Sequence, residues 1–143
     1  MAGLSARLRL DYPGTGKNKS LFGGKSPEQM AEETRQQKVS LLRNVPVQGI
    51  YIEDIDMSQE IYCVADDING RMLAYAPVLI TFSSDSIEDA IRFCMQEEFR
   101  TVEVLAPDTI ELTRYDLERL LFTVGQELVE FKDFLMRRLN NWR

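Results

Sequence analysis

The stretch EIYCVADDINGRMLAYAPVLITF, residues 60–82, predicts two adjacent antiparallel strands joined by a tight turn. Its two apolar runs are separated by Asn69-Gly70, a pair that type I′ hairpin turns favour because both central residues need positive φ. A two-residue loop at this pair places Val64 opposite Tyr75. The stretch therefore predicts a hairpin at the centre of the chain.

Elements on either side of this hairpin extend the pattern. Before it, residues 47–55 alternate apolar and polar side chains as a half-buried strand does, so we expect a three-stranded antiparallel meander. Pro77 interrupts the third strand and indicates an edge position or a bend there. After it, apolar residues at 87, 90, 91 and 94 predict an amphipathic helix that ends near Phe99, followed by a short strand over 101–106.

The last thirty residues hold the clearest helix. Thr113 is a suitable N-cap with Asp116 three residues later. A helix over 114–142 would be about 43 Å long, more than one small sheet can cover. Part of its apolar surface should therefore contact a second chain, or else a helix predicted over 26–45, which Ser26 caps and Pro27 begins. The residues that we expect to bind a partner are Leu121, Val124, Leu128, Phe131, Leu135 and Trp142.

Charge divides the chain into a basic N-terminal part and an acidic body. Residues 1–45 carry eight Lys/Arg and four Asp/Glu, whereas residues 46–143 carry nine and nineteen. Residues 11–26 are dominated by Gly, Lys, Ser and Pro and lack apolar periodicity, so we expect residues 1–25 to be a flexible basic arm. Within this arm, Leu21, Phe22, Lys17 and Lys19 are the expected partner-binding residues. The alternative is that the arm lies on its own acidic domain.

Several kinds of site lack the residues that they need. The chain has no histidine and two cysteines, which excludes histidine-dependent catalytic triads and four-thiolate zinc within one chain. Asp54, Asp56 and Ser58 have the spacing of a calcium loop, but the glycine and glutamate that complete such a loop are missing. We therefore expect no catalytic residue, no cofactor and no metal site, and we interpret Cys63 and Cys94 as packing thiols.

Partner classes can also be narrowed from composition. The basic residues are scattered and the body is acidic, so we expect no direct nucleic-acid binding. No secretory leader and no apolar run long enough to span a membrane is found, which predicts a cytoplasmic protein with no membrane contact.

The order of elements and the run Ala106-Pro-Asp-Thr-Ile-Glu-Leu-Thr113, which leads into Leu117, Leu120 and Leu121, resemble the YbjN-like domains and the type III secretion chaperones. The resemblance implies a non-catalytic acidic dimer that holds segments of a client or partner, and it carries over no catalytic residue. The interrupted third strand and the glycine-rich arm depart from it.

Together these patterns predict an α+β fold: an antiparallel three- to five-stranded sheet with a long C-terminal helix and a second helix packed on it, and a flexible N-terminal arm. Its domains would be the arm over 1–25, a helix over 26–45 and an α+β domain over 46–143. The predicted function is a non-enzymatic protein-interaction module, an adaptor, chaperone-like or regulatory subunit that binds protein partners and can form a homodimer. The alternatives are a small-ligand-sensing domain and, further off, a thiol- or metal-dependent enzyme.

Overall fold

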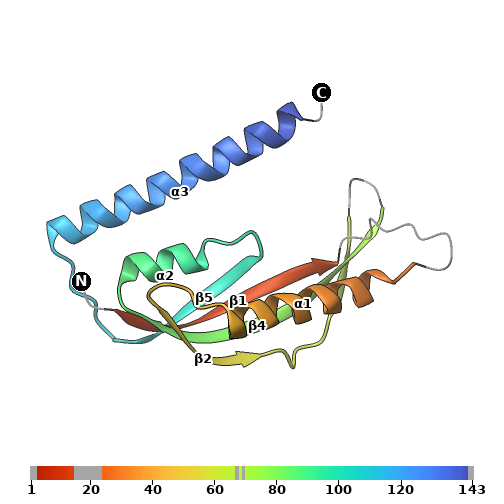
Figure 1. Cartoon of the computed structure of the whole chain (residues 1–143), viewed down its shortest axis with the longest axis horizontal. Coiled ribbons are helices and arrows are strands. Elements are labelled where there is room, and N and C mark those ends of the chain that lie inside the picture. Colours follow the sequence, from red (N-terminus) through yellow and green to blue (C-terminus); the bar gives the residue numbers. More distant parts are fainter. Residues whose placement is uncertain (1–2, 15–23, 67, 69, 142–143) are drawn as a thin grey trace.

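The computed structural model describes residues 3–14, 24–66, 68 and 70–141, and it has an α+β architecture (Figure 1). A five-stranded antiparallel sheet is combined with three helices, as the sequence predicts. In chain order the elements are β1 (Leu4–Gly14), α1 (Pro27–Asn44), β2 (Ile50–Asp56), β3 (Tyr62–Ala65), β4 (Met72–Ser84), α2 (Ile87–Cys94), β5 (Phe99–Ala106) and α3 (Arg114–Asn140).

β1 corrects the prediction of a flexible arm over residues 1–25. Residues 4–14 form an interior strand that pairs with β4 from Leu4↔Ser84 to Gly14↔Ala74 and with β5 on its other side. A signal for this strand is present in the sequence, because apolar and polar side chains alternate from Leu4 to Tyr12. The polar positions of this alternation include Arg7 and Arg9, which also give the segment a positive charge. The charge therefore favoured the interpretation as a basic tail over that of a strand. Residues 15–23 lie outside the described residues.

The core lies between the sheet and two helices that cover one of its faces (Figure 1). Every second residue of β1 and β4 points into it, and Leu8, Ile80 and Phe82 are fully buried. Val39 of α1 and Phe93 of α2 belong to the same cluster, so both helices lie on the same face. Phe93 meets Phe82 edge to face, with ring centroids 4.9 Å apart.

The expected three-stranded meander is wrong. β2 and β3 do not follow one another across the sheet; both pair with β4, β2 along residues 79–84 and β3 along residues 72–75. β4 is 13 residues long, so its one edge accommodates two short strands end to end. The sheet order is β2-β4-β1-β5, with β3 also on β4.

The hairpin between β3 and β4 also differs from the prediction in register. Val64 lies opposite Leu73, not Tyr75. The loop is longer than two residues because Asp66 and Arg71 close it through a 2.8 Å backbone hydrogen bond. The carboxylate of Asp66 accepts from the backbone N–H of Ile68 at 2.9 Å, a local turn that competes with the two-residue loop.

Pro77 lies inside β4, at the point where β2 has ended and β3 has not yet paired on that edge. The strand can include proline because no neighbour needs its missing N–H there. The guanidinium of the buried Arg35 fills the interval, donating to the carbonyl of Pro77 at 3.1 Å and to that of Gln59 at 2.9 Å. The interruption predicted at Pro77 is therefore a short unpaired interval along one edge of β4. Arg35, a residue of α1, covers this interval.

α1 begins as predicted, with Ser26 and Gln29 forming a reciprocal capping box and Pro27 in the first turn. Its N-terminal end packs directly on the end of β1. A Cβ added to Gly14 would lie 2.1 Å from the carbonyl oxygen of Pro27 and 2.6 Å from the backbone nitrogen of Ala31. Glycine at 14 therefore permits close approach of helix and strand.

Replacement of Leu8 by alanine tests the interior position of β1. Because Leu8 is fully buried, Leu8→Ala should lower the unfolding free energy by about 2–5 kcal/mol in denaturant melts. The matched control is Leu41→Ala, at a side chain that is 56% exposed on α1 and should shift stability by about 0.5 kcal/mol or less. Equal effects of the two substitutions would contradict an interior β1.

Candidate functional site

The longest helix of the chain, α3, begins where the sequence predicts. The Thr113 hydroxyl accepts from the backbone N–H of Asp116, and the Asp116 carboxylate accepts from that of Thr113, both at 3.1 Å. These hydrogen bonds lower the pKa of Asp116. The helix then continues to Asn140 and is 27 residues long.

α3 lies against α2, which separates it from the sheet (Figure 1). Its two buried residues are Leu120 and Thr123, both in the N-terminal half. An ion pair of 3.0 Å between Arg119 and Glu88 strengthens the same junction. The C-terminal half extends past the end of α2 with no buried residue. The alternative that α1 covers this helix is wrong, because α1 packs on β1 and β4.

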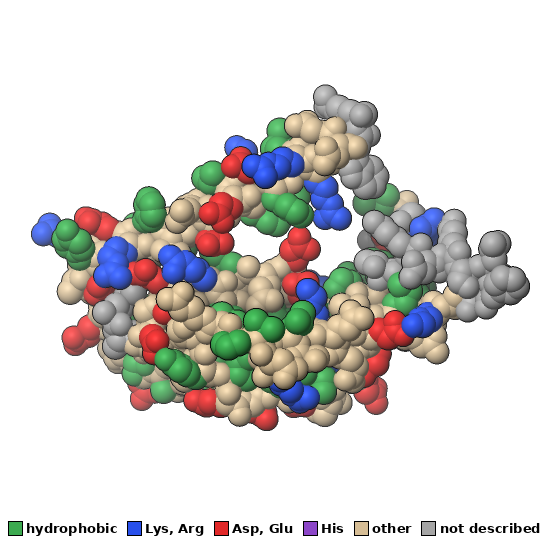
Figure 2. All heavy atoms as spheres, viewed as in Figure 1, with side chains coloured by type: hydrophobic (Ala, Val, Ile, Leu, Met, Phe, Trp, Pro, Cys, Tyr) green, Lys and Arg blue, Asp and Glu red, His purple; other side chains and the backbone are tan. Residues whose placement is uncertain are grey.

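Most apolar side chains of α3 are exposed to solvent, and Figure 2 shows them on both sides of the helix. Leu121 and Leu128 are 63% and 60% exposed. Of the residues predicted to bind a partner, Phe131 and Leu135 are also exposed and Val124 is half-buried. Trp142, Leu21, Phe22, Lys17 and Lys19 lie outside the described residues. The remaining exposed large apolar side chains of α3 are Tyr115, Leu117, Phe122, Val129, Phe134, Met136 and Leu139.

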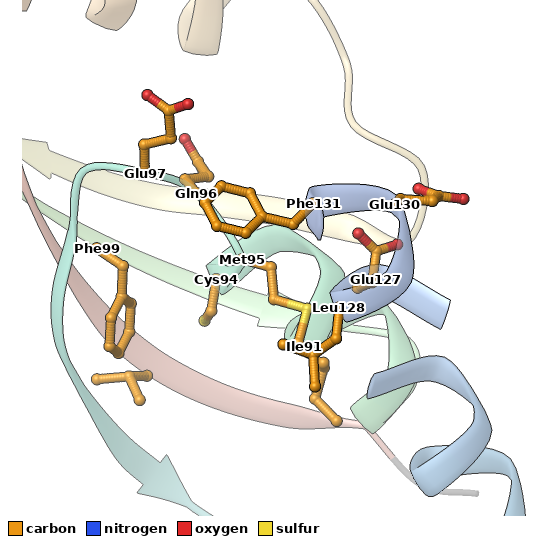
Figure 3. Close-up of a pocket in the computed structure, with 11 residues that line it drawn as sticks. Ile91, Cys94, Met95, Gln96, Glu97, Phe99, Glu127, Leu128, Glu130 and Phe131 are labelled. Carbon is orange, nitrogen blue, oxygen red and sulfur yellow. The ribbon is translucent and has the colours of Figure 1, made fainter. Parts of the chain in front are cut away.

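An open cavity of about 770 Å³ lies between α2, β5 and α3. Leu128 and Phe131 reach it from α3, and side chains of α2 and β5 form the other walls (Figure 3). Phe99 and Val102 of β5 pair with Leu10 and Leu8, so they share the helix-covered face of the sheet. They remain partly exposed, since β1 is the one described element with extensive contacts to β5. The walls from α2 and the following turn are Ile91, Cys94, Met95, Gln96 and Glu97, and α3 also contributes Glu127 and Glu130.

The opposite face of the sheet carries a polar cluster that the sequence analysis missed. Asp11 accepts from Nε of Arg9 at 2.9 Å, from Nε of Arg100 at 3.3 Å and from the hydroxyl of Tyr62. Tyr62 stacks on Tyr75 at 5.4 Å, and Arg100 lies 5.0 Å above the Tyr75 ring. Burial and the hydrogen bond to Asp11 raise the pKa of Tyr62.

This cluster joins β1, β3, β4 and β5 on the face opposite the three helices that the structure describes. The Asp11 side chain is 1% exposed, and both of its oxygens accept hydrogen bonds from cationic or phenolic donors. Such a satisfied network positions strands, since a buried carboxylate is stable only with partners of this kind. We assign it a structural role.

Neither cysteine has the environment of a nucleophile. Burial raises the pKa of Cys94 to about 11. The exposed thiol of Cys63 donates to Oε1 of Glu28 at 2.9 Å, and this contact with a carboxylate raises the pKa of Cys63. Reactive thiols need neighbouring positive charge, which favours the thiolate.

The acidic loop after β2 is organised by its own backbone. Asp56 accepts from the backbone N–H of Ser58 at 2.8 Å, and its hydrogen bonds with Ser58 lower the pKa of Asp56. Across the described ranges no group of three or more acidic or thiol side chains is placed to hold a metal ion. The part of the chain that the structure describes also has no helix with the length and apolar character to cross a membrane.

Comparisons with protein-family models, with curated proteins and with solved structures give no match to this chain. The function proposed below is therefore based on the fold and the surface of this chain.

Substitution of Glu28 by glutamine tests the assignment of Cys63. Removing the carboxylate should lower the pKa of the thiol, so Cys63 should react faster with iodoacetamide at mildly alkaline pH. Peptide mass spectrometry measures the rate separately at each cysteine. Glu33→Gln, on the same helix, should leave the rate unchanged, and an unchanged rate in Glu28→Gln would contradict the assignment.

Proposed function

We propose that this chain is a non-enzymatic protein-interaction module that binds a protein partner through α3. The observation that carries the proposal is the row of apolar side chains that α3 exposes while its own fold buries only Leu120 and Thr123. Burying one leucine or phenylalanine side chain contributes about 1.5–3 kcal/mol. Soluble monomers rarely leave a large contiguous apolar patch in water, and such patches mark interaction surfaces.

The position of α3 supports the same proposal. It is held at its N-terminal half by α2 and by the ion pair between Arg119 and Glu88, so its exposed half is presented by a fixed support. A partner would also meet the walls of the open cavity, which Phe131 and Leu128 of α3 share with Phe99 of β5 (Figure 3). An apolar helix face beside an apolar groove is a common arrangement for binding a partner helix.

Two acidic substitutions on the exposed stripe test the proposal. Wild type should elute with a mass above the 16.5 kDa of one chain, or with a co-purifying protein in stoichiometric amount. Leu128→Asp/Phe131→Asp should lose that association because charged side chains cannot be buried in an apolar interface. Size-exclusion chromatography with light scattering measures both results.

The matched control for that variant is Phe122→Asp/Val129→Asp, which places the same change on exposed apolar residues on another side of α3. It should retain the association, and circular dichroism should show the same helix content in both variants. A wild type that is monomeric and binds nothing, or a control that loses association equally, would contradict the proposal.

A second candidate function is binding of a small apolar ligand, which the cavity favours. Its volume of about 770 Å³ lies in the usual range of ligand sites. Glu97, Glu127 and Glu130 are among its lining residues, so neutral or cationic apolar molecules fit better than nucleotides.

A thermal-shift screen tests this candidate. Neutral or cationic apolar compounds should raise the melting temperature of wild type, and nucleotides should not. Val102→Trp places an indole in the cavity from a side chain that is 44% exposed, so the variant should fold and lose the response. A flat screen would count against the ligand-binding candidate and leave the docking proposal unaffected.

A further inference from the structure

We propose that the partner of α3 is α3 of a second copy of this chain, and that the two helices form a parallel two-stranded coiled coil. This inference rests on the proposed function and names its partner. It follows from the spacing of the apolar residues, from the side of α3 that α2 leaves free, and from two charged residues beside the stripe.

Six of the apolar residues of α3 follow the spacing of a coiled-coil seam. Successive steps of four, three, four, three and four residues separate them, an average near the 3.5 residues that keep a seam facing a partner helix. The next residue in the series is Arg138, where the apolar row ends. The row is about 27 Å long at 1.5 Å per residue. Its members are Leu117, Leu121, Val124, Leu128, Phe131 and Leu135.

The buried contact with α2 lies to one side of the row, although Leu128 and Phe131 of the row also line the cavity beside α2. Leu120 and Thr123, the buried residues, precede Leu121 and Val124 by one position each. At 3.6 residues per turn they lie about a quarter turn from the centre of the row. Val124 is half-buried and the other members of the row are exposed. A second helix along the row would therefore also cover the cavity wall that Leu128 and Phe131 form beside α2.

Two side chains of opposite charge beside the row would meet between two parallel copies of α3. Glu127 and Lys132 flank the seam and are five residues apart, the separation at which side chains of two parallel helices meet across it. Two symmetric Glu127–Lys132 pairs would then form between the copies. Within the described residues neither side chain has an ion pair of its own.

The other flanking positions suit the same alignment. A five-residue step sets Phe134 against Leu139, so an apolar side chain meets an apolar neighbour. Leu120, which the same step sets against Gly125, is already buried. A Cβ added to Gly125 would meet nothing within 4 Å, so the backbone there is open to a second helix.

An antiparallel pair that overlaps the whole row suits these charges less well. It would bring Lys132 near Glu118 of the second copy, which is favourable, but it would also set Glu127 against Glu127. Like charges facing each other repel, and the parallel pair has no such contact. The parallel orientation is therefore the better match to the charges of α3.

Charge reversal tests the partner and the orientation together. Wild type should have about twice the mass of one 16.5 kDa chain by light scattering. Glu127→Lys and Lys132→Glu should each weaken the dimer at low salt, by about three- to tenfold in Kd, because each creates two like-charge pairs. The double variant should recover wild-type affinity, since it restores opposite charges. An antiparallel pair would give no recovery, because the lysines introduced at position 127 would face each other and the glutamate introduced at position 132 would face Glu118.

Cross-linking gives an independent measurement of orientation. In a Cys63→Ser/Cys94→Ser background, Val124→Cys should form an interchain disulfide under mild oxidation, because a parallel seam sets position 124 against itself within the Cα distance of about 7 Å that a disulfide allows. Phe122→Cys, which lies away from the row, should not.

Three results would overturn the inference. These are a monomeric wild type, a dimer whose affinity does not recover in the charge-reversed double variant, or a dimer in which Val124→Cys does not cross-link. A wild type that is monomeric alone but binds a different protein through Leu128 and Phe131 would overturn this inference and leave the proposed function standing.

Discussion

β1 pairs along both of its edges, and the positions of all the later elements depend on that pairing. Its ladder with β4 runs the whole length from Leu4 to Gly14, and its ladder with β5 attaches the last strand to the sheet. The side chains that it points inward, Leu8 and Leu10 among them, form the surface on which α1 and α2 pack. Because α2 carries α3, the exposed helix is placed by residues more than a hundred positions earlier in the chain.

The open surface of the molecule follows from where the helices stop. α1 and α2 cover the inner face of β4 and β1 but leave β5 uncovered, with Phe99 and Val102 partly exposed. α3 has the length and the apolar residues to cover that strand, yet it lies over α2 instead, and a cavity remains between them. Apolar surface on a strand and on a helix therefore faces the same open space, which is where we place the binding of a partner.

Polar side chains hold the fold at the points where regular pairing fails. Arg35 satisfies the carbonyls of Pro77 and Gln59 in the interval between β2 and β3. Asp11 accepts hydrogen bonds from Arg9, Arg100 and Tyr62 on the face of the sheet opposite the described helices. Both sites bury charge together with its hydrogen-bond partners, and this is the condition under which buried charge is tolerated. These hydrogen bonds give the charged residues a structural role in the fold.

Features that depend on near neighbours in the chain can be predicted from the order of the amino acids. The caps at Ser26 and Thr113, the extent of α3 and the strand character of β4 follow from residues within a few positions of each other. The arrangement of the elements in space depends on the tertiary structure. It makes β1 an interior strand, pairs both β2 and β3 with β4, and forms the Asp11 cluster and the cavity. These depend on contacts between segments far apart in the chain, as in Leu4↔Ser84 and Ser5↔Ala106. A local pattern sets which face of a strand is apolar, but it does not identify the strand that will lie beside it, because pairing is selected by the packing of the whole core.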